Sequence, residues 1–240
     1  MIPAWQKGIV KRIEQRTART RSYWLELPET AAFDFKPGQF VTLDLPIHEQ
    51  RNKRWRSYSI ASGPDGGNVM ELVIVHLEGG IGSEYIFNEL KEGSELTLRG
   101  PQGVFVLPEN LDRDLYLICT GTGIAPFRSM LQYIQSNNLP LQHTIHLIFG
   151  TRTQGDMLYE TELRALEKKM TGFYYHPALS REIRDGYSAG YVHPIYESIA
   201  KPVVPAKFML CGWRNMIDEA KQRIQLLGFD RKDIQEELYG

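Results

Sequence analysis

The sequence predicts two domains of different fold class, an antiparallel β-domain at residues 1–110 and an α/β domain with a parallel sheet at residues 111–240. In the first half, short segments rich in β-branched and aromatic residues are separated by turn-forming runs such as Lys36-Pro37-Gly38. This pattern is typical of a barrel or a sandwich. In the second half, apolar runs of strand length alternate with helical patterns, which is typical of βαβ units. The boundary falls near residues 108–114, where the rhythm changes.

The individual elements follow from the same patterns. In the first half we expect strands at residues 22–27, 40–45, 57–61, 69–76 and 95–99, and one helix at about 83–90 with Ser83 as its N-cap. In the second half we expect strands at 115–119, 144–149, 173–178 and 208–211, and helices at 126–137, 156–169, 191–200 and 215–227. The second-half strands are apolar along their length, so their sheet is expected to be covered on both faces.

Composition and charge narrow the class of protein. The 240 residues are 42% hydrophobic and 24% charged with a net charge of −1, which favours neither a nucleic-acid nor a membrane partner. No apolar run approaches the roughly 20 residues that span a bilayer, and the N-terminus lacks a signal-peptide pattern. We therefore expect a cytoplasmic protein. The two cysteines, Cys119 and Cys211, are too few for an iron–sulfur cluster and form no zinc pattern, so no metal is expected and any electron carrier has to be an organic cofactor.

Two glycine-rich turns precede expected helices. One is Gly79-Gly80-Ile81-Gly82-Ser83, and the other is Thr120-Gly121-Thr122-Gly123-Ile124-Ala125-Pro126 after the first strand of the second half. A helix N-terminus presents free N–H groups and a positive dipole to an anion such as a phosphate. Each run also fits a plain turn. One such turn in each domain indicates two phosphate-bearing ligands.

A basic run leads into a short polar strand. The stretch consists of Arg51, Lys53 and Arg54, followed by Arg56-Ser57-Tyr58-Ser59. A guanidinium can hold a phosphate through two hydrogen bonds, and a tyrosine ring can lie on a planar heterocycle. A charge run is also typical of a solvated surface, and a strand tyrosine of simple packing. Strand alternation puts Arg56 and Tyr58 on one face and the two serines on the other.

Taken in order along the chain, these motifs resemble the ferredoxin–NADP reductase superfamily. The matching segments are Pro37-Gly38-Gln39-Phe40, the R-x-Y-S motif at 56–59, the glycine loop ending at Ser83, Gly100-Pro101-Gln102-Gly103-Val104-Phe105, the turn at 120–126, Ser180-Arg181, Cys211-Gly212 and Glu237-Leu238-Tyr239. Any one of them could arise by chance, but eight in this order are specific. The resemblance implies an N-terminal antiparallel β-barrel with one capping helix that binds FAD, followed by an α/β domain with a parallel sheet that binds NAD(P).

In the first domain the resemblance implies a set of FAD contacts. Arg56 would contact the pyrophosphate, Tyr58 would stack on the isoalloxazine, and Ser59 would hydrogen-bond near flavin N5. Relatives often carry an arginine where His76 stands, so a packing role for His76 remains an alternative. The implied FAD-binding residues are Arg56, Ser57, Tyr58, Ser59, Ile74, His76, Gly80, Gly82 and Ser83.

In the second domain the resemblance implies a nicotinamide dinucleotide site. Its residues are Thr120, Gly121, Thr122, Gly123, Pro126, Arg152, Ser180, Arg181, Tyr191, Cys211 and Gly212, and the cofactor contact of Tyr239 is with the flavin. Ser180-Arg181 matches the family's pair for the 2′-phosphate of NADP, Arg152 follows a strand end, and Tyr191 can stack on the adenine. These features favour NADP. Two nearby carboxylates, Glu182 and Asp185, keep NAD as an alternative, because NAD is usually held by a carboxylate on its ribose.

The implied catalytic residues are Ser59, Cys211, Glu237 and Tyr239. Cys211 would lie near the hydride-donating carbon, Glu237 would handle protons, and Tyr239 would stack on the flavin and move when nicotinamide enters. A buried strand residue is the alternative for Cys211, as it is for Cys119, which matches no motif. The plant-type pattern ends on the aromatic residue, whereas here Gly240 follows. A simple last strand with Tyr239 exposed is therefore the alternative for the tail.

The function that the resemblance implies is the transfer of hydride from NADPH to FAD and of single electrons to a protein carrier such as ferredoxin or flavodoxin. The basic run at 51–56 is the expected docking surface for an acidic carrier. The reductase component of an oxygenase and a reductase of free flavins or dyes are alternative enzymes. A non-enzymatic module that binds FAD or a dinucleotide is a further alternative, against which Ser59, Cys211 and Glu237 together speak.

Overall fold

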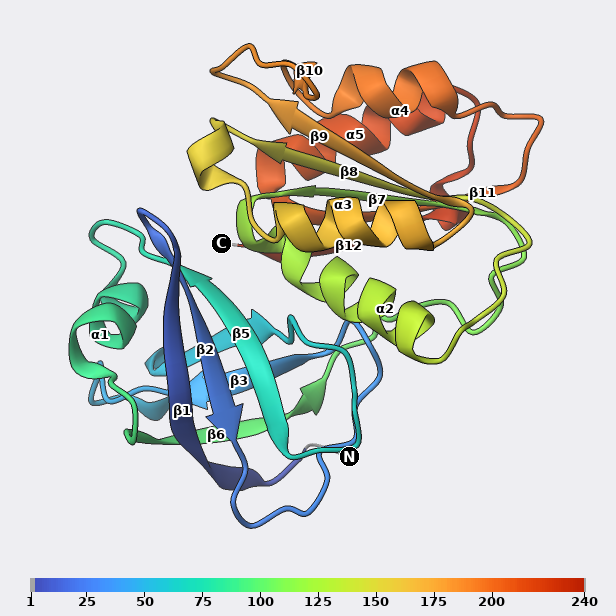
Figure 1. Ribbon diagram of the computed structural model, residues 1–240. Coiled ribbons are helices and arrows are strands. Elements are labelled where there is room, and N and C mark those ends of the chain that lie inside the picture. The colour runs from blue at the N-terminus through green and yellow to red at the C-terminus, as the bar shows by residue number, and fades with distance from the viewer. Residues whose placement is uncertain (1–2, 240) are drawn as a thin grey trace. The chain divides into compact units, whose positions relative to one another are not determined.

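The computed structural model describes residues 3–239 and consists of two compact units (Figure 1). Unit 1 comprises Met1–Leu107 and Ala125–Ser136, and unit 2 comprises Pro108–Ile124 and Asn137–Gly240. The segment at 125–136, which the sequence pattern groups with the second half, packs with unit 1. No helix among the described residues is long and apolar enough to cross a membrane.

Unit 1 is built on six antiparallel strands. They are β1 (Trp5–Thr17), β2 (Thr20–Glu26), β3 (Phe40–Asp44), β4 (Trp55–Ser59), β5 (Val69–Val75) and β6 (Glu95–Gln102). The strand order is β4-β3-β6-β1-β2-β5. A bridge between Ile60 and Leu72 links the end of β4 to β5, the two outer strands of this order, so the sheet closes into a barrel.

The helix α1 (Ile81–Glu89) closes the barrel core. Ile86 is completely buried and Leu90 nearly so, within the same cluster as Tyr23, Leu25 and other strand residues. The Tyr23 hydroxyl, also buried, donates a hydrogen bond to the Ile86 carbonyl at 3.2 Å. The predicted antiparallel barrel with one capping helix is thus confirmed.

The expected cap of this helix is wrong. Gly80, not Ser83, is the N-cap, and the Glu84 N–H bonds to the Gly80 carbonyl at 2.9 Å. The Ser83 hydroxyl lies one turn further on, where it accepts the Leu77 N–H at 3.0 Å and lies 3.0 Å from the Gly80 carbonyl. Ser83 therefore fastens the preceding turn to the helix, and the first N–H groups of α1 receive no side-chain cap.

The longest strand, β1, was absent from the sequence expectation. Its charged and polar side chains obscure the alternation that marks a half-buried strand. In the structure two of these side chains lie over an aromatic ring: the guanidinium groups of Arg12 and Arg16 are 4.6 and 5.3 Å from the Trp24 ring centroid. The strand is identified by its pairing with both β2 and β6, which is a long-range property.

Unit 2 contains six parallel strands. They are β7 (Asp114–Thr120), β8 (Ile145–Thr151), β9 (Phe173–Leu179), β10 (Ser188–Ala189), β11 (Ala206–Trp213) and β12 (Ile234–Tyr239), in the order β10-β9-β8-β7-β11-β12. The helices of the second half are α2 (Ile124–Ser136), α3 (Glu160–Lys169), α4 (His193–Ile199) and α5 (Arg214–Leu226). The predicted parallel α/β domain is confirmed, with β10 and β12 as additional strands at the sheet edges.

Helices cover this sheet as its apolar strands require. Ile195 and Tyr196 of α4 and Ile217 of α5 are buried with side chains of the central strands. Helix α3 lies along β9, where the Glu167 carboxylate accepts the Tyr175 N–H at 2.7 Å (Figure 1). Because strands and helices alternate, the strand ends at Thr120, Thr151, Leu179 and Trp213 lie at one edge of the sheet.

A row of aromatic rings crosses the opposite half of the sheet. Phe208, Tyr116, His146 and Tyr174 are consecutive partners in the strand register. Their ring centroids are 4.9 to 5.0 Å apart and their planes differ by 13–16°. His146 Nδ1 also lies 3.0 Å from His176 Nε2, so one of the two neutral rings donates to the other. Burial, together with neighbouring His176, lowers the pKa of His146 to about 4.

This depressed pKa predicts a loss of stability in acid. The unfolded chain binds a proton at His146 near pH 6.5, whereas the folded chain does so only near pH 4. The free energy of unfolding therefore does not vary with pH through this residue above pH 6.5 and decreases as the pH falls from 6.5 to 4. His146→Phe, which keeps a ring in the row, should lose less free energy of unfolding than the native protein between pH 7 and 4.5. The expected difference is about 2 kcal/mol. Urea titrations at the two pH values measure it, and parallel losses in both proteins would contradict this prediction.

Candidate functional site

The centre of the site in unit 1 is the crossing of Arg56 over the start of α1. Arg56 Nη1 donates to the carbonyls of Lys53 at 3.0 Å and Trp55 at 2.8 Å, which fixes the side chain along its own strand. A Cβ at Gly82 would lie 2.9 Å from Arg56 Nε and 3.0 Å from its Cγ. Glycine at position 82 therefore lets the guanidinium lie against the first turn of the helix. Within residues 3–239, Arg56 has no ion-pair partner.

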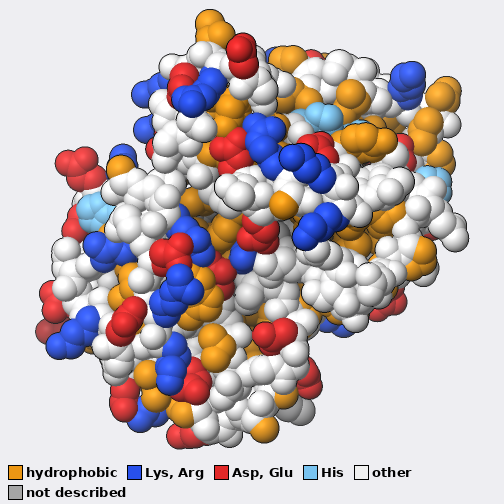
Figure 2. Space-filling view, viewed as in Figure 1, with side chains coloured by type: hydrophobic (Ala, Val, Ile, Leu, Met, Phe, Trp, Pro, Cys, Tyr) orange, Lys and Arg blue, Asp and Glu red, His pale blue; other side chains and the backbone are white. Residues whose placement is uncertain are grey.

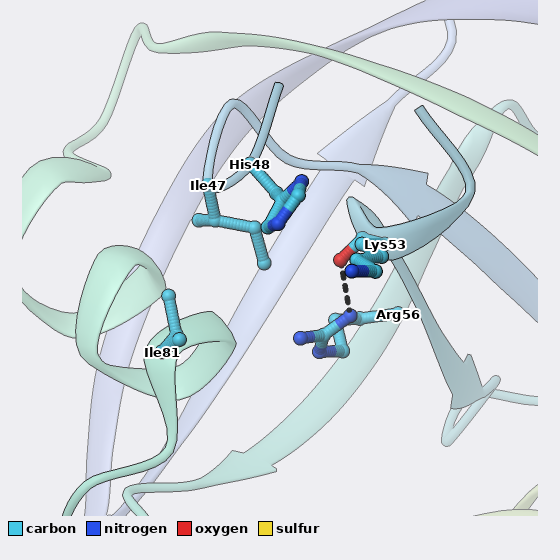
Figure 3. A pocket seen from close by; sticks show the side chains of 5 residues that line it. All are labelled: Ile47, His48, Lys53, Arg56 and Ile81. Atoms are coloured by element: carbon cyan, nitrogen blue, oxygen red, sulfur yellow. Dashed lines mark hydrogen bonds between the residues drawn. The ribbon is translucent and has the colours of Figure 1, made fainter. Parts of the chain in front are cut away.

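A cavity of about 340 Å³ opens beside this crossing, lined by Ile47, His48, Lys53, Arg56 and Ile81 (Figure 3). Among the described residues neither Arg56 nor Lys53 has a carboxylate partner. These two cations and the uncapped start of α1 surround one space, which fits a phosphate-bearing ligand.

The sequence analysis assigns neither Ile47 nor His48 to a site, and it assigns Lys53 to partner docking. Ile47 and His48 lie in the loop after β3, and no local pattern marks that loop as part of a site. Lys53 was expected to serve partner docking alone, but the structure places it in the cavity with Arg56. The fold of the loop decides this, because β3 and β4 are paired and bring both its ends together.

The other motif residues of β4 occupy distinct environments. Tyr58 packs against the barrel core, and burial raises the pKa of its phenol, so the ring stays neutral. The exposed Ser57 has its hydroxyl 3.1 Å from that of Thr42, whereas Ser59 is 4% exposed. The flavin contacts expected for Ser57, Tyr58 and Ser59 remain predictions.

On β5 and just beyond it, the structure separates the two expected ligand residues. Ile74 is buried in the barrel core. His76 Nε2 lies 3.1 Å from a Glu84 carboxylate oxygen, and its ring packs 5.0 Å from Phe87. This hydrogen bond is the main cause that lowers the pKa of Glu84. His76 thus has the packing contacts of its alternative role, at the first turn of α1.

In unit 2 the glycine turn is held by close backbone contacts. Gly121–Gly123 form a 3₁₀ turn after β7, and a Cβ at Gly123 would lie 2.4 Å from the Cys211 carbonyl oxygen. A Cβ at Gly212, which has φ +143°, would lie 2.5 Å from Thr120 Oγ1. Thr120 Oγ1 is buried and forms no hydrogen bond to any described residue. A tight turn with a spare polar atom fits the backbone of a dinucleotide.

The expected phosphate residues meet at the same sheet edge. The Ser180 N–H bonds to the Thr151 carbonyl at 3.0 Å and the Arg181 N–H to the Arg152 carbonyl at 2.9 Å, which brings the two arginines to adjacent positions after β8 and β9. Both arginines are exposed. No ion pair involves Arg152 or Arg181 in the part of the chain that the structure describes. The two guanidinium groups therefore form a solvent-exposed cationic pair, and the Ser180 hydroxyl lies next to it in the chain.

Two residues of the expected dinucleotide site remain, Tyr191 and Pro126. Tyr191, between β10 and α4, is 73% exposed, which leaves its ring face open to stacking. Pro126 is buried in the first turn of α2 and belongs to unit 1. The position of Pro126 is compatible with its expected effect on the helix start.

The expected catalytic residues of unit 2 lie on neighbouring strands. In the register Cys211 pairs with Cys119 on β7 and with Glu237 on β12. Both thiols are fully buried, and burial raises their pKa well above the ordinary value. Tyr239, beside Trp213, is half-buried. The sequence left open a simple last strand with an exposed Tyr239. The tail does form the last strand, but Tyr239 is not exposed. Gly240 lies outside the described residues.

These features define a two-domain oxidoreductase that binds FAD and a nicotinamide dinucleotide. The oxidoreductase FAD-binding domain matches residues 7–107, and the oxidoreductase NAD-binding domain matches residues 117–222. Over 228 residues the chain is 33% identical to ferredoxin–NADP reductase B of Sorangium cellulosum, with 91% of each chain covered. The protein belongs to the ferredoxin–NADP reductase family.

The chain is also similar to an oxygenase component and to a solved reductase structure. The chain is 31% identical over 189 residues to the anthranilate 1,2-dioxygenase electron transfer component of Acinetobacter baylyi, covering 78% of this chain and 53% of that protein. It thus spans about half the length of this relative. The crystal structure of a ferredoxin NADP+ reductase from Neisseria gonorrhoeae with bound FAD and NADP shares the fold, with a TM-score of 0.80, 24% identity and 98% of both chains covered.

Among residues 3–239, no group of three or more His, Cys, Asp or Glu side chains could hold a metal ion.

The Arg56–Gly82 crossing yields a direct prediction. Gly82→Ala should displace the guanidinium and weaken FAD binding about tenfold, which corresponds to about 1.4 kcal/mol. Alanine favours a helix more than glycine does, so α1 itself should not weaken. Titration of the apoprotein with FAD, followed by flavin fluorescence, measures the dissociation constant. Glu89→Ala, an exposed change in the same helix, is the control, and equal affinities of all three proteins would refute the role of the crossing.

Proposed function

We propose that this protein passes hydride from NADPH to bound FAD and then releases electrons singly to a protein carrier such as ferredoxin or flavodoxin. The observation that supports this most directly is the pair of glycine-dependent cradles, one in each unit: Arg56 against Gly82, and the Gly121–Gly123 turn against Cys211. Each cradle suits one phosphate-bearing cofactor. A two-electron donor and a flavin in one protein suit the conversion of a hydride into single electrons.

Bound FAD would supply a nitrogen that accepts hydride and the capacity to release electrons one at a time. The protein's part is to bind and orient. Arg56 and Lys53 would hold the pyrophosphate at the start of α1, Tyr58 would offer its ring to the isoalloxazine, and the Ser59 hydroxyl would bond near the accepting nitrogen. Orientation of this kind lowers the barrier because the reacting atoms no longer have to find one another.

Cys211 would contribute shape and not charge. Because burial raises the pKa of its thiol, Cys211 stays protonated at neutral pH and is neither a base nor a nucleophile. The neighbouring Glu237, its partner in the strand register, is the residue we assign to proton handling. Tyr239 would cover the flavin until nicotinamide enters.

The contacts of Glu182 favour NADPH over NADH. Glu182, which together with Asp185 is the argument for NAD, accepts the Gln154 N–H through one oxygen at 2.9 Å, and its other oxygen lies 3.4 Å from Arg184 Nη1. Its carboxylate is therefore occupied within the protein. Arg152 and Arg181 have no such partners among residues 3–239 and would meet the 2′-phosphate that only NADPH carries.

An anaerobic titration tests both the reaction and the nucleotide. The yellow flavoprotein should be bleached by NADPH at a lower concentration than by NADH. Replacing both arginines, Arg152→Gln with Arg181→Gln, should raise the KM for NADPH roughly 10- to 100-fold, because two charge-assisted contacts are lost. The KM for NADH should change little.

Other outcomes would reject parts of this proposal. A flavin that neither nucleotide bleaches would indicate the non-enzymatic binding module. An equal loss with both nucleotides in the double variant would reject the 2′-phosphate assignment. Rapid reduction of free FMN or dyes, with no reduction of ferredoxin or flavodoxin, would favour the free-flavin or dye reductase.

The basic run before β4 is the proposed carrier-docking surface, but not all of its residues are available for docking. Arg54 Nε lies 2.8 Å from an Asp44 carboxylate oxygen and 3.1 Å from the Leu45 carbonyl, so this side chain holds the loop. The Arg51 side chain is 64% exposed and lies 3.8 Å from Asp44. On the face shown in Figure 2, Lys and Arg side chains are mixed with Asp and Glu, so a docking contact would be local.

Charge reversal at Arg51 tests the docking surface. Arg51→Glu should lower kcat/KM for ferredoxin or flavodoxin several-fold at low salt, and the effect should shrink at high salt. Ferricyanide reduction should stay unchanged. Lys168→Glu, an exposed change at the end of α3, is the matched control. The same loss in both variants, or a loss that salt does not reduce, would reject Arg51 as a docking residue.

An oxygenase component is the second candidate acceptor. It is supported by the similarity to the dioxygenase electron transfer component, of which this chain spans about half. The two cysteines of these 240 residues cannot hold an iron–sulfur cluster, so any such centre would lie outside this sequence. Reduction of purified ferredoxins, flavodoxins and Rieske-type components in parallel would rank these acceptors.

A further inference from the structure

The loop at residues 181–191 of unit 2 carries two of the residues expected to contact NADPH, but no apolar core holds it. Arg181 stands at its start and Tyr191 at its end, and both side chains are exposed. Its one strand, β10, is two residues long and pairs with the end of β9. Ile183 is 91% exposed. Burial of apolar side chains therefore does not fix the course of this loop.

Two polar side chains attach the loop to neighbouring segments of the same unit. Among residues 182–190, all but Glu182, Tyr187 and Gly190 are exposed. The Glu182 carboxylate binds the turn after β8, and the Tyr187 hydroxyl binds the start of α3. The least exposed side chains of the loop are thus those that bond to the rest of the domain.

The Tyr187 attachment consists of several contacts around one carboxylate. The Tyr187 hydroxyl donates a hydrogen bond to a Glu160 carboxylate oxygen, and the same oxygen accepts Arg164 Nε at 2.7 Å. Arg164 Nη2 donates to the Gly186 carbonyl at 3.2 Å, and the guanidinium carbon lies 5.2 Å from the Tyr187 ring centroid. Burial opposes ionisation of Glu160, but the hydrogen bonds from Tyr187 and Arg164 outweigh it and lower the pKa of its carboxyl. The acceptor is therefore charged at neutral pH, which strengthens these hydrogen bonds.

The Glu182 attachment joins the loop to the turn that carries Arg152. One Glu182 oxygen accepts the Gln154 N–H at 2.9 Å. Gln154 begins a 3₁₀ turn that a capping box stabilises. Next to this contact, the Arg181 N–H bonds to the Arg152 carbonyl at 2.9 Å. Two adjacent contacts therefore fix the backbone positions of the two arginines relative to each other.

An ordered loop favours NADPH in particular. Without the two attachments, Arg181 would occupy many positions, and coenzyme binding would include the entropy loss of ordering the loop. NADPH carries the 2′-phosphate that Arg152 and Arg181 would contact, whereas NADH lacks it. Loss of the loop's order should therefore weaken the binding of NADPH more than that of NADH.

We propose that Glu182 and Tyr187 are positioning residues for the 2′-phosphate of NADPH. They hold the loop so that Arg181 lies beside Arg152 before the coenzyme binds, and they touch no part of the coenzyme. This role rests on the proposed function, since it needs NADPH as the hydride donor. It also reverses the role that a carboxylate next to Arg181 would have in an NAD site, because here the acidic residue serves NADPH.

Pairs of conservative variants separate positioning from direct contact. Glu182→Met keeps the length of the side chain but cannot accept the Gln154 N–H, whereas Glu182→Gln removes the charge and keeps an acceptor oxygen. Tyr187→Phe removes the hydroxyl and keeps the ring. Its matched control is Tyr174→Phe, at an exposed ring of β9. For each FAD-loaded protein we would measure kcat and KM with NADPH and with NADH, using ferricyanide as the electron acceptor.

Limited digestion with trypsin reports on the loop without any nucleotide. Trypsin cleaves after exposed arginines, and Arg181 and Arg184 both lie in this loop and are exposed. Release of an attachment should accelerate cleavage there, because proteolysis follows local opening of the chain. Melting temperatures show whether the domain itself stays folded.

We expect the KM for NADPH to rise roughly three- to tenfold in Glu182→Met and Tyr187→Phe, because binding then includes the ordering of the loop. Cleavage of the loop should accelerate in the same two variants. The KM for NADH and both kcat values should change little, and Glu182→Gln and Tyr174→Phe should behave as native.

Other results would overturn this role. A higher KM for NADH alone, or a lower KM for NADPH, in Glu182→Met would place its carboxylate at the coenzyme. Equal rises in both KM values would reject the assignment to the 2′-phosphate, and native KM values would reject positioning whether or not cleavage accelerates. A native protein with a lower KM for NADH than for NADPH would overturn the proposed nucleotide and this role together, whereas the digestion result would still show whether the attachments hold the loop.

Discussion

The buried carboxylate of Glu71 fixes the relative course of three segments of unit 1. It joins β2 through Ser22, β1 through Arg16 and α2 through Arg128, while its own backbone pairs with Ala61. A charge buried to this extent is tolerable only while its partners stay in place. The network therefore stabilises this arrangement of the segments relative to slightly shifted ones. The end of β4 lies next to the network.

At two positions, a glycine allows the backbone to lie directly against another segment of the chain. At Gly82 and Gly123 a single methyl group would displace a guanidinium or collide with a carbonyl oxygen. Both positions stand at the start of a helix, where N–H groups remain free for an anion. One physical device, a helix start packed too closely for any side chain, thus occurs once in each unit.

Charge pairing separates structural cations from those available for ligands. Arg54 and Arg128 are bound to buried carboxylates and hold the fold. Arg56, Arg152 and Arg181 have no carboxylate partner within residues 3–239 and stand at the cradles or the sheet edge. A guanidinium group without a carboxylate partner keeps its N–H groups available for charge-assisted hydrogen bonds to a phosphate.

Strand and helix periodicity and glycine turns are local properties, so the sequence by itself determined the fold class of each half and the helix in the first. The order of its motifs carried the resemblance that predicted the barrel and the family. Tertiary structure decided the rest. Which cations are paired, that Glu182 accepts the Gln154 N–H, and that Lys53 lines a cavity with Ile81 all depend on residues distant in the chain. The strand β1 also escaped local patterning, since its pairing with β2 and β6 identifies it. The sequence specifies the chemical nature of each side chain, but the fold determines which groups lie close enough to interact with it.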